Sequence, residues 1–385
     1  MPLLTTLLTL TLLPLAALPN PVKSGSSCTD ATTTTSPPPA DGTSPSTTLT
    51  ATATARNSGL NKAARAKGKL WFGTAADFPG TSGELQDGSY MREFGDGGDW
   101  GEATPANIMK FDATEPQQNV FNFTGAEQFL RIAEGGRKLV RCHNLIWSSQ
   151  LPAWVTSPST PWTNATLSAV LVNHVQTLLD VVNEAFADSP SGSYASNIWY
   201  DTIGPEYVAL AFKTAADVVR ERKLKVKLYY NDYNIEFPGA KATAAQELVR
   251  ELQRRGIRID GVGLESHFIA GSTPSQADQE ANMNAFAALN VDIAVTELDV
   301  RVTLPPTLAV QEQQVKDYYS TVAACVNVRR CIGVTVWDFV DTYSWVPSTF
   351  AGQGYADLFF QPQGAGTPLV KKAAYDGCLR ALTGA

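Results

Sequence analysis

Two glutamates at the ends of apolar runs are the residues of this chain that could do chemistry together. The segment LDVVNE ends in Asn183 and Glu184, and the segment DIAVTE ends in Glu297. A carboxylate at the tip of a buried strand is costly unless it is hydrogen-bonded or its pKa rises. Two glutamates facing each other across a cleft form the minimal apparatus for glycoside hydrolysis. The alternative is a structural ion pair without a catalytic role.

Aromatic and polar residues cluster at or just beyond the ends of other apolar runs. Sugar rings present apolar faces and many hydroxyls, so a sugar-binding cleft needs aromatic platforms together with amide, lysine and histidine side chains. A single tryptophan is more often a core residue, but several that alternate with polar groups favour a binding cleft. The candidate platforms are Trp147, Trp154, Trp337 and Trp345, and the candidate polar groups are Asn107, Lys110, Gln150, Asn183 and Asn231.

From about residue 60 onward, apolar strands alternate with amphipathic helices. The predicted strands cover 69–75, 104–111, 138–147, 179–184, 225–234, 261–268, 292–300 and 332–339. The helices between them include 125–136, 165–178, 205–223 and 242–256. This alternation fits a (β/α)8 barrel, although a doubly wound sheet would produce a similar pattern.

The positions of the polar residues distinguish these two folds. Polar or aromatic clusters end nearly every predicted strand. In a doubly wound sheet such clusters concentrate at one crevice, whereas a closed barrel brings all strand ends to one point. The sequence therefore predicts an α/β fold of the (β/α)8 TIM-barrel type, with a site at the C-terminal ends of its strands.

Seven ordered segments carry a family resemblance. PANIMKFDATEP, RCHNLIWSSQLPAW, LDVVNEAF, KLYYNDYN, DGVGLESHF, AVTELDV and GVTVWDFVDTYSW follow one another along the chain. Together they resemble glycoside hydrolase family 10, the retaining endo-β-1,4-xylanases, over about residues 60–378. The resemblance implies a (β/α)8 barrel, a β-1,4-xylan substrate and no cofactor.

The resemblance also implies roles for individual residues. Glu184 matches the acid/base and Glu297 the nucleophile, while His267 and Asp299 match a network that keeps the nucleophile ionised. Asn183 matches the amide that binds the sugar 2-hydroxyl. The predicted substrate-binding set is Asn107, Lys110, His143, Trp147, Gln150, Asn183, Asn231, Glu265, Trp337 and Trp345.

The chain departs from the family pattern at four places. Ser148 stands where the family often has histidine, and Glu265 stands where many members have glutamine. Ala106 stands where glutamate is common. The fourth departure is a truncated lead-in to the fourth strand, because helix 165–178 runs directly into Asp180. A helix-to-strand connection usually takes about 2–6 residues. This connection and the first half of the strand are both missing, which together amounts to about ten residues. The gap is either a genuine deletion or a splicing artefact.

The N-terminal region differs in composition from the rest of the chain. Residues 1–20 form an apolar run that is typical of a signal peptide and is interrupted by Pro14. Residues 21–59 are rich in serine, threonine and proline, and this composition predicts a disordered linker. Residues 60–385 form the single catalytic domain. We therefore expect a secreted, extracellular protein.

Cysteines and sequons agree with secretion. Cys325 and Cys331 are close in sequence and flank an apolar strand signal, so they suit a local disulfide, whereas Cys28, Cys142 and Cys378 have no evident partners. Asn122 and Asn164 begin N-glycosylation sequons. The net charge is −7 and no lysine- or arginine-rich run occurs, so we expect no nucleic-acid partner. We also expect no metal site, no membrane association, and a monomer that acts on xylan.

Three functions remain open at this stage. The first is endo-hydrolysis of xylan. The second is hydrolysis of another β-glycoside, such as a plant glycoside, because Glu265 and Ala106 alter the cleft. The third is a vestigial carbohydrate-binding protein, because a shortened fourth strand could misplace Glu184.

The truncated lead-in gives a direct prediction. We expect a variant with the missing connector inserted before Asp180 to hydrolyse xylan much faster than the chain with the present sequence, because misplacing a catalytic group by about 1 Å costs about 100-fold in rate. The measurement is reducing-sugar release from xylan by both proteins at equal concentration. Equal rates would contradict the prediction.

Overall fold

The computed structural model describes residues 59–80, 83–177 and 181–384. The predicted signal peptide, Cys28 and nearly all of the predicted linker lie outside the described residues. So do residues 178–180, which include part of the predicted fourth strand.

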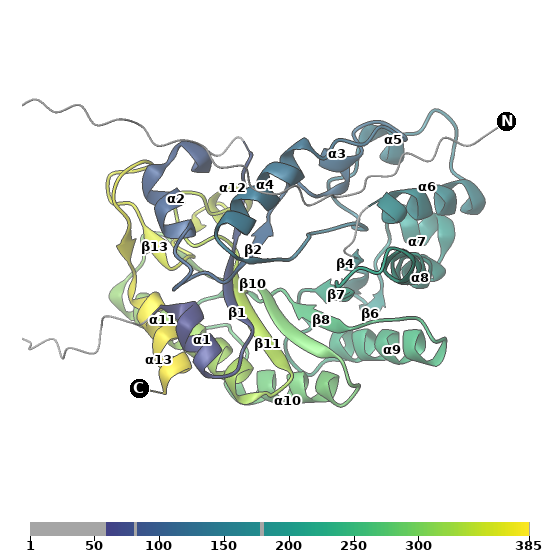
Figure 1. Ribbon diagram of the computed structural model, residues 1–385. Coiled ribbons are helices and arrows are strands. Elements are labelled where there is room, and N and C mark those ends of the chain that lie inside the picture. Colours follow the sequence, from purple (N-terminus) through teal and green to yellow (C-terminus); the bar gives the residue numbers. More distant parts are fainter. Residues whose placement is uncertain (1–58, 81–82, 178–180, 385) are drawn as a thin grey trace, which may run out of the picture. The chain divides into compact units, whose positions relative to one another are not determined.

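Eight parallel strands form the central sheet (Figure 1). Their order is β3-β2-β1-β11-β10-β8-β7-β4, and a parallel bridge between Ile146 and Val182 joins the two ends of this series. The sheet is therefore closed, and the predicted (β/α)8 barrel is confirmed. The strands are β1 Trp71–Ala76, β2 Glu102–Pro105, β3 Leu139–Val140, β4 Val182–Asn183, β7 Tyr229–Asp232, β8 Gly261–Leu264, β10 Asp292–Thr303 and β11 Cys331–Val336.

Helices connect the strands, and the apolar residues that recur on one face of a helix pack it against the sheet. In α8, for example, Val208, Phe212 and Ala215 are buried against the sheet at helical spacing, and Pro205 precedes the first turn. Among the described residues, no helix is long and apolar enough to cross a membrane. The helices are α1 Leu60–Ala66, α2 Gly88–Phe94, α3 Phe111–Thr114, α4 Thr124–Gly135, α5 Ala153–Thr156, α6 Asn164–Thr177, α7 Ile198–Ile203, α8 Glu206–Glu221, α9 Ala240–Arg254, α10 Gln276–Ala287, α11 Leu308–Asn327, α12 Val346–Thr349 and α13 Ala373–Thr383, with a 3-10 turn, η2, at Glu84–Gln86.

Short strands and one disulfide extend the barrel. Cys325 at the end of α11 is bonded to Cys331 at the start of β11, as the sequence analysis predicts. Helices α11 and α13 pack side by side near α1 (Figure 1). The additional strands are β5 Phe186–Asp188, β6 Ser191–Tyr194, β9 His267–Ile269, β12 Gln353–Gly354, β13 Phe359–Phe360 and β14 Val370–Lys371.

Several strand boundaries differ from the prediction. The predicted strand 104–111 ends at Pro105, because proline cannot donate to a ladder and the chain then turns so that the Lys110 amide bonds to the Asn107 carbonyl. The predicted strand 138–147 keeps only two regular residues. Beyond Val140 the chain follows a less regular path that brings polar side chains to the strand ends. The fourth strand is also short, with only Val182 and Asn183 in regular pairing.

Candidate active site

A cleft of about 740 Å³ lies at the C-terminal ends of the barrel strands. Most of the predicted site residues line it, and they come from nearly every strand end. This convergence is the consequence of barrel closure that the sequence analysis anticipates. The predicted residues that line the cleft are Asn107, Lys110, His143, Trp147, Gln150, Asn183, Glu184, Glu265, His267, Glu297, Trp337 and Trp345.

Asn231, at the end of β7, lies behind the cleft and connects the two candidate catalytic residues. Its Nδ2 lies 3.1 Å from Oε1 of Glu297 and 2.8 Å from Oδ1 of Asn183. Asn183 in turn donates from Nδ2 to Oε1 of Glu184 at 3.1 Å. A continuous series of hydrogen bonds therefore joins the side chains of Glu184 and Glu297.

The local structure of β8 and β10 makes this arrangement possible. A Cβ on Gly263 of β8 would lie 2.1 Å from Oδ1 of Asn231, so glycine leaves the space that the amide occupies. The register between β10 and β11 shifts between Val295 and Leu298. In a regular strand, consecutive side chains face opposite ways, but here both Thr296 and Glu297 bond to Asn231.

Glu297 is almost completely buried, and cationic groups surround it. Both terminal nitrogens of Arg141 lie 3.1 Å from its Oε1, and Nε2 of His267 lies 3.4 Å from its Oε2. Burial alone would raise the pKa of the Glu297 carboxyl, but the charges around it hold that pKa well below its usual range. Burial lowers the pKa of His143 and keeps this imidazole neutral, so the stabilising charge comes from Arg141 and His267.

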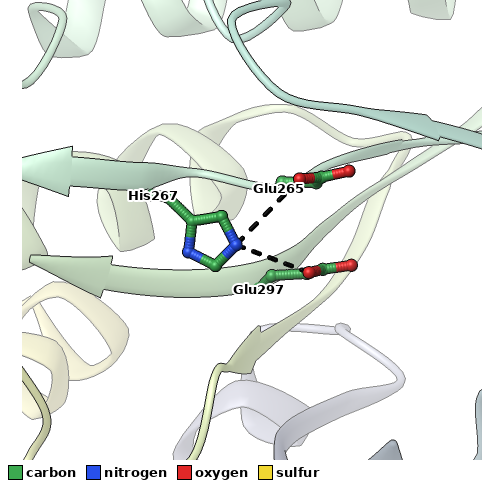
Figure 2. Close-up of side chains that lie close together, drawn as sticks. All are labelled: Glu265, His267 and Glu297. Atoms are coloured by element: carbon green, nitrogen blue, oxygen red, sulfur yellow. Dashed lines mark ion pairs between the residues drawn. The ribbon is translucent and has the colours of Figure 1, made fainter. Parts of the chain in front are cut away.

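His267 carries that charge because a second carboxylate supports it. Its Nδ1 lies 2.8 Å from Oδ2 of Asp299, which also accepts a 2.7 Å hydrogen bond from Nε1 of Trp345. Burial opposes the charged imidazole, but Asp299 and Glu297 raise the pKa of His267 to about 10. Figure 2 shows its ring directed toward both Glu265 and Glu297.

Glu265 is a third buried carboxyl at the same place. Its Oε1 accepts from Nδ2 of Asn231 at 2.9 Å, and its Oε2 lies 4.0 Å from Nε2 of His267. Burial, together with the charge of Glu297, raises the pKa of Glu265 well above its usual range. Glu265 is therefore a neutral acid, which can donate a hydrogen bond as a glutamine would.

Glu184 has the electrostatic environment opposite to that of Glu297. It follows the two-residue strand β4 and has a left-handed backbone with φ of 52°. Burial, together with the nearby charges of Asp232 and Glu297, raises the pKa of its carboxyl to about 7. Glu184 therefore holds a proton near neutrality, whereas Glu297 is ionised. Two carboxyls in opposite protonation states are the pair that acid-assisted displacement needs.

Lys110, Asn107 and Gln150 form a polar triangle on one wall of the cleft. Nζ of Lys110 lies 3.0 Å from Oδ1 of Asn107 and 2.5 Å from Oε1 of Gln150. Nε2 of Gln150 completes the triangle with a 3.0 Å bond to Asn107. The ammonium group also lies 4.7 Å from the ring centre of Trp147, so the indole and the amides hold it in one position.

The aromatic walls agree with the prediction except at one residue. Trp337 packs edge-on against His143 at 5.2 Å, and Trp345 lies 4.8 Å from the ring of His267. Trp154, which the sequence analysis counts as a platform, does not line the cleft. Its indole nitrogen donates to the carbonyl of Glu115, and its ring packs against Phe111, so it supports the outer layer.

The sequence analysis missed Arg141, which contacts Glu297, and several residues that line the cleft, among them Arg301. Arg141 precedes His143 by two positions, and Arg301 follows Asp299 by two, so strand alternation could have identified both. Arg301 stacks on Phe350, with its guanidinium 4.0 Å from the ring centre. Further lining residues are Asp77, Tyr233, Asn234, Asp338, Tyr343, Ser344 and Ser348.

Two clusters among the described residues have ligand-type atoms within 4.8 Å of one another. They are Glu265, His267 and Glu297 in the cleft, and Glu93, Asp96 and Asp99 away from it. In the cleft, His267 would have to lose its proton before it could bind a metal ion, and the charge of Arg141 opposes a second cation. We therefore assign this cluster to acid–base chemistry.

Comparisons with known proteins agree with this geometry. The model of glycosyl hydrolase family 10 matches residues 59–380. Endo-1,4-beta-xylanase D of Talaromyces funiculosus is 48% identical over 84% of this chain and 77% of its own length. A xylanase structure from Bispora sp. MEY-1 with xylobiose is 67% identical, covers 84% of this chain and 99% of its own, and superposes with a TM-score of 0.83. A Penicillium canescens endo-1,4-beta-xylanase structure is 53% identical, covers 85% of this chain and 98% of its own, and superposes with a TM-score of 0.79.

The raised pKa of His267 predicts a pH dependence of stability. A histidine whose folded pKa is about 10 and whose unfolded pKa is about 6.5 stabilises the fold fully below pH 6.5. That contribution is lost as the pH rises from 6.5 through 10, at a rate that approaches about 1.4 kcal/mol per pH unit. Urea unfolding of the native protein and of His267→Asn across this range measures it. The stability difference between the two proteins should shrink as the pH rises, and a constant difference would contradict the assignment.

Proposed function

The chain belongs to glycosyl hydrolase family 10 and is an endo-1,4-β-xylanase, and we propose that Glu184 is its acid/base and Glu297 its nucleophile. One observation carries this assignment. Both side chains line the same cleft, with Glu184 protonated near neutrality and Glu297 ionised. The hydrogen-bond series through Asn183 and Asn231 fixes one relative to the other.

In the first step, the ionised carboxylate of Glu297 attacks the anomeric carbon. The bond from that carbon to the glycosidic oxygen breaks, and Glu184 gives its proton to the departing oxygen. The product is a glycosyl ester on Glu297. Arg141 and His267 keep the attacking carboxylate charged, and protonated Glu265 places a neutral donor beside it.

In the second step, the roles of Glu184 reverse. Its carboxylate takes a proton from a water molecule, the water oxygen attacks the anomeric carbon, and the ester bond to Glu297 breaks. Two inversions at the same carbon retain its configuration. The nearby charge of ionised Glu297 raises the pKa of Glu184, so ester formation removes a charge that favours its proton.

The remaining cleft residues suit a xylan chain. Asn183 places an amide beside the acid, where it can bind the sugar 2-hydroxyl, while Lys110, Asn107 and Gln150 offer donors and acceptors to further hydroxyls. Trp337 and Trp345 supply apolar faces against which sugar rings can pack. The P. canescens enzyme and the T. funiculosus enzyme both carry the name endo-1,4-beta-xylanase, which supports the same substrate for this chain.

Secretion, the domain boundaries and glycosylation belong to the same proposal. A signal peptide at 1–20 and a linker at 21–59 would precede the catalytic domain. The Cys325–Cys331 disulfide supports an oxidising compartment, and the exposed positions of Asn122 and Asn164 are compatible with glycan attachment. The vestigial alternative is less well supported, because Glu184 lies in the cleft and is hydrogen-bonded to Asn183.

Substitution of the two glutamates tests the assignment. Glu297→Ala should abolish reducing-sugar release from xylan, because it removes the ionised carboxylate that forms the ester. Glu184→Ala should lower the rate by about 10²–10⁴-fold, the usual contribution of general acid–base catalysis. Glu93→Ala, which alters a half-buried glutamate outside the cleft, is the control and should retain activity. Unchanged activity in Glu297→Ala would refute the proposed role.

A further inference from the structure

We propose that Tyr230 and Asp232 of β7 are positioning residues, which hold the carboxyl of Glu184 in place by binding the backbone that follows it. This proposal rests on the acid/base role proposed for Glu184. It concerns how a catalytic group on a two-residue strand keeps a defined position.

The residues just ahead of Glu184 are held on both edges of β4. On one edge, the Asn183 amide donates to the Ile146 carbonyl at 2.9 Å, and the Ile146 amide donates to the Val181 carbonyl at 3.3 Å. On the other edge, Val182 and Asn183 pair with Tyr230 and Asn231. Glu184 itself has φ of 52°, a conformation that a non-glycine residue keeps only when its surroundings determine it.

The support that follows Glu184 comes from three consecutive residues of β7. The amide of Glu184 donates to the carbonyl of Asn231 at 2.9 Å. The amide of Ala185 donates to the hydroxyl of Tyr230 at 3.2 Å, and the amide of Phe186 donates to Oδ2 of Asp232 at 3.4 Å. A regular parallel ladder uses only backbone acceptors, so the two side chains extend the ladder past the point where the chain turns.

The two side chains are themselves held firmly. Tyr230 and Asp232 are fully buried, and the tyrosine hydroxyl donates to Oδ2 of the same aspartate. Lys241 of α9 lies 3.0 Å from Oδ1 of Asp232 and 3.1 Å from Oδ1 of Asp188, the last residue of β5. The lysine side chain is only 3% exposed. One cation therefore ties the β7 aspartate to the hairpin that follows Glu184.

Tyr230→Phe separates positioning from general stability. The change removes only the hydroxyl that accepts from Ala185 and donates to Asp232, and it leaves the aromatic ring in the core. Tyr375→Phe is a matched control because Tyr375 is also a buried tyrosine whose hydroxyl donates to a buried aspartate, Asp99. Asp99 also accepts from a backbone amide, that of Leu60, and it lies outside the cleft.

The readout is the dependence of rate on the leaving group. The dinitrophenolate group of a dinitrophenyl β-xylobioside departs without protonation. The phenolate group of a phenyl β-xylobioside needs a proton from the acid to depart. We expect Tyr230→Phe to lower kcat/KM on the phenyl substrate by about 10-fold or more, because small displacements of a catalytic group are costly. On the dinitrophenyl substrate kcat/KM should be nearly unchanged. Azide attacks the glycosyl ester without the help of a base. Added azide should therefore raise the kcat of Tyr230→Phe on the dinitrophenyl substrate.

The outcomes distinguish this proposal from the function on which it rests. An equal loss on both substrates, or no loss on the phenyl substrate, would overturn the positioning role. Glu184→Ala must show the same leaving-group dependence in a stronger form, and its absence would instead overturn the acid/base assignment. Tyr375→Phe should show no such dependence. If Tyr230→Phe does not fold, Asp232→Asn provides the same comparison, since it removes the charge that Lys241 and Tyr230 bind.

Discussion

The burial of an ionised Glu297 is the constraint on which the rest of the site depends. A carboxylate in an almost dry environment is stable only when charges and hydrogen-bond donors replace the water it has lost. Arg141, His267 and Asn231 supply these, and Asp299 with Trp345 keeps His267 in the charged form. Burial and the negative charge of Glu297 keep Glu265 protonated. The charge that makes Glu297 reactive therefore also fixes the protonation of its neighbours.

The barrel matters because it brings these groups together from separate strands. Arg141 follows β3, Asn231 lies on β7, and His267 and Glu297 lie on β9 and β10. No local segment could supply this combination. Asn231 is central because its one amide nitrogen contacts Asn183, Glu265 and Glu297. The bulge in β10 and the missing side chain at Gly263 are local departures from regular structure that give this amide its space.

Much of this arrangement could be predicted from the sequence, and the failures have physical causes. Alternating strands with polar ends predict the barrel and place Glu184 and Glu297 at one cleft. Strand pattern alone could not locate the end of β2, where Pro105 and the turn at Asn107 override an apolar run. It also could not separate Trp154 from the true cleft tryptophans, because both types stand near strand ends. The contacts of Tyr230 with the backbone after Glu184 depend on the path of the chain beyond β4, which side-chain periodicity does not encode.

The central claim is that Glu297 forms the covalent bond, and trapping that bond tests it most directly. A xylobioside with fluorine in place of the sugar 2-hydroxyl and a dinitrophenyl leaving group should form the glycosyl ester and then hydrolyse slowly. Mass spectrometry of the digested protein should find one xylobiosyl label per chain, on the peptide that contains Glu297. A label on Glu184 or Glu265, or turnover of xylan without any label, would contradict the account.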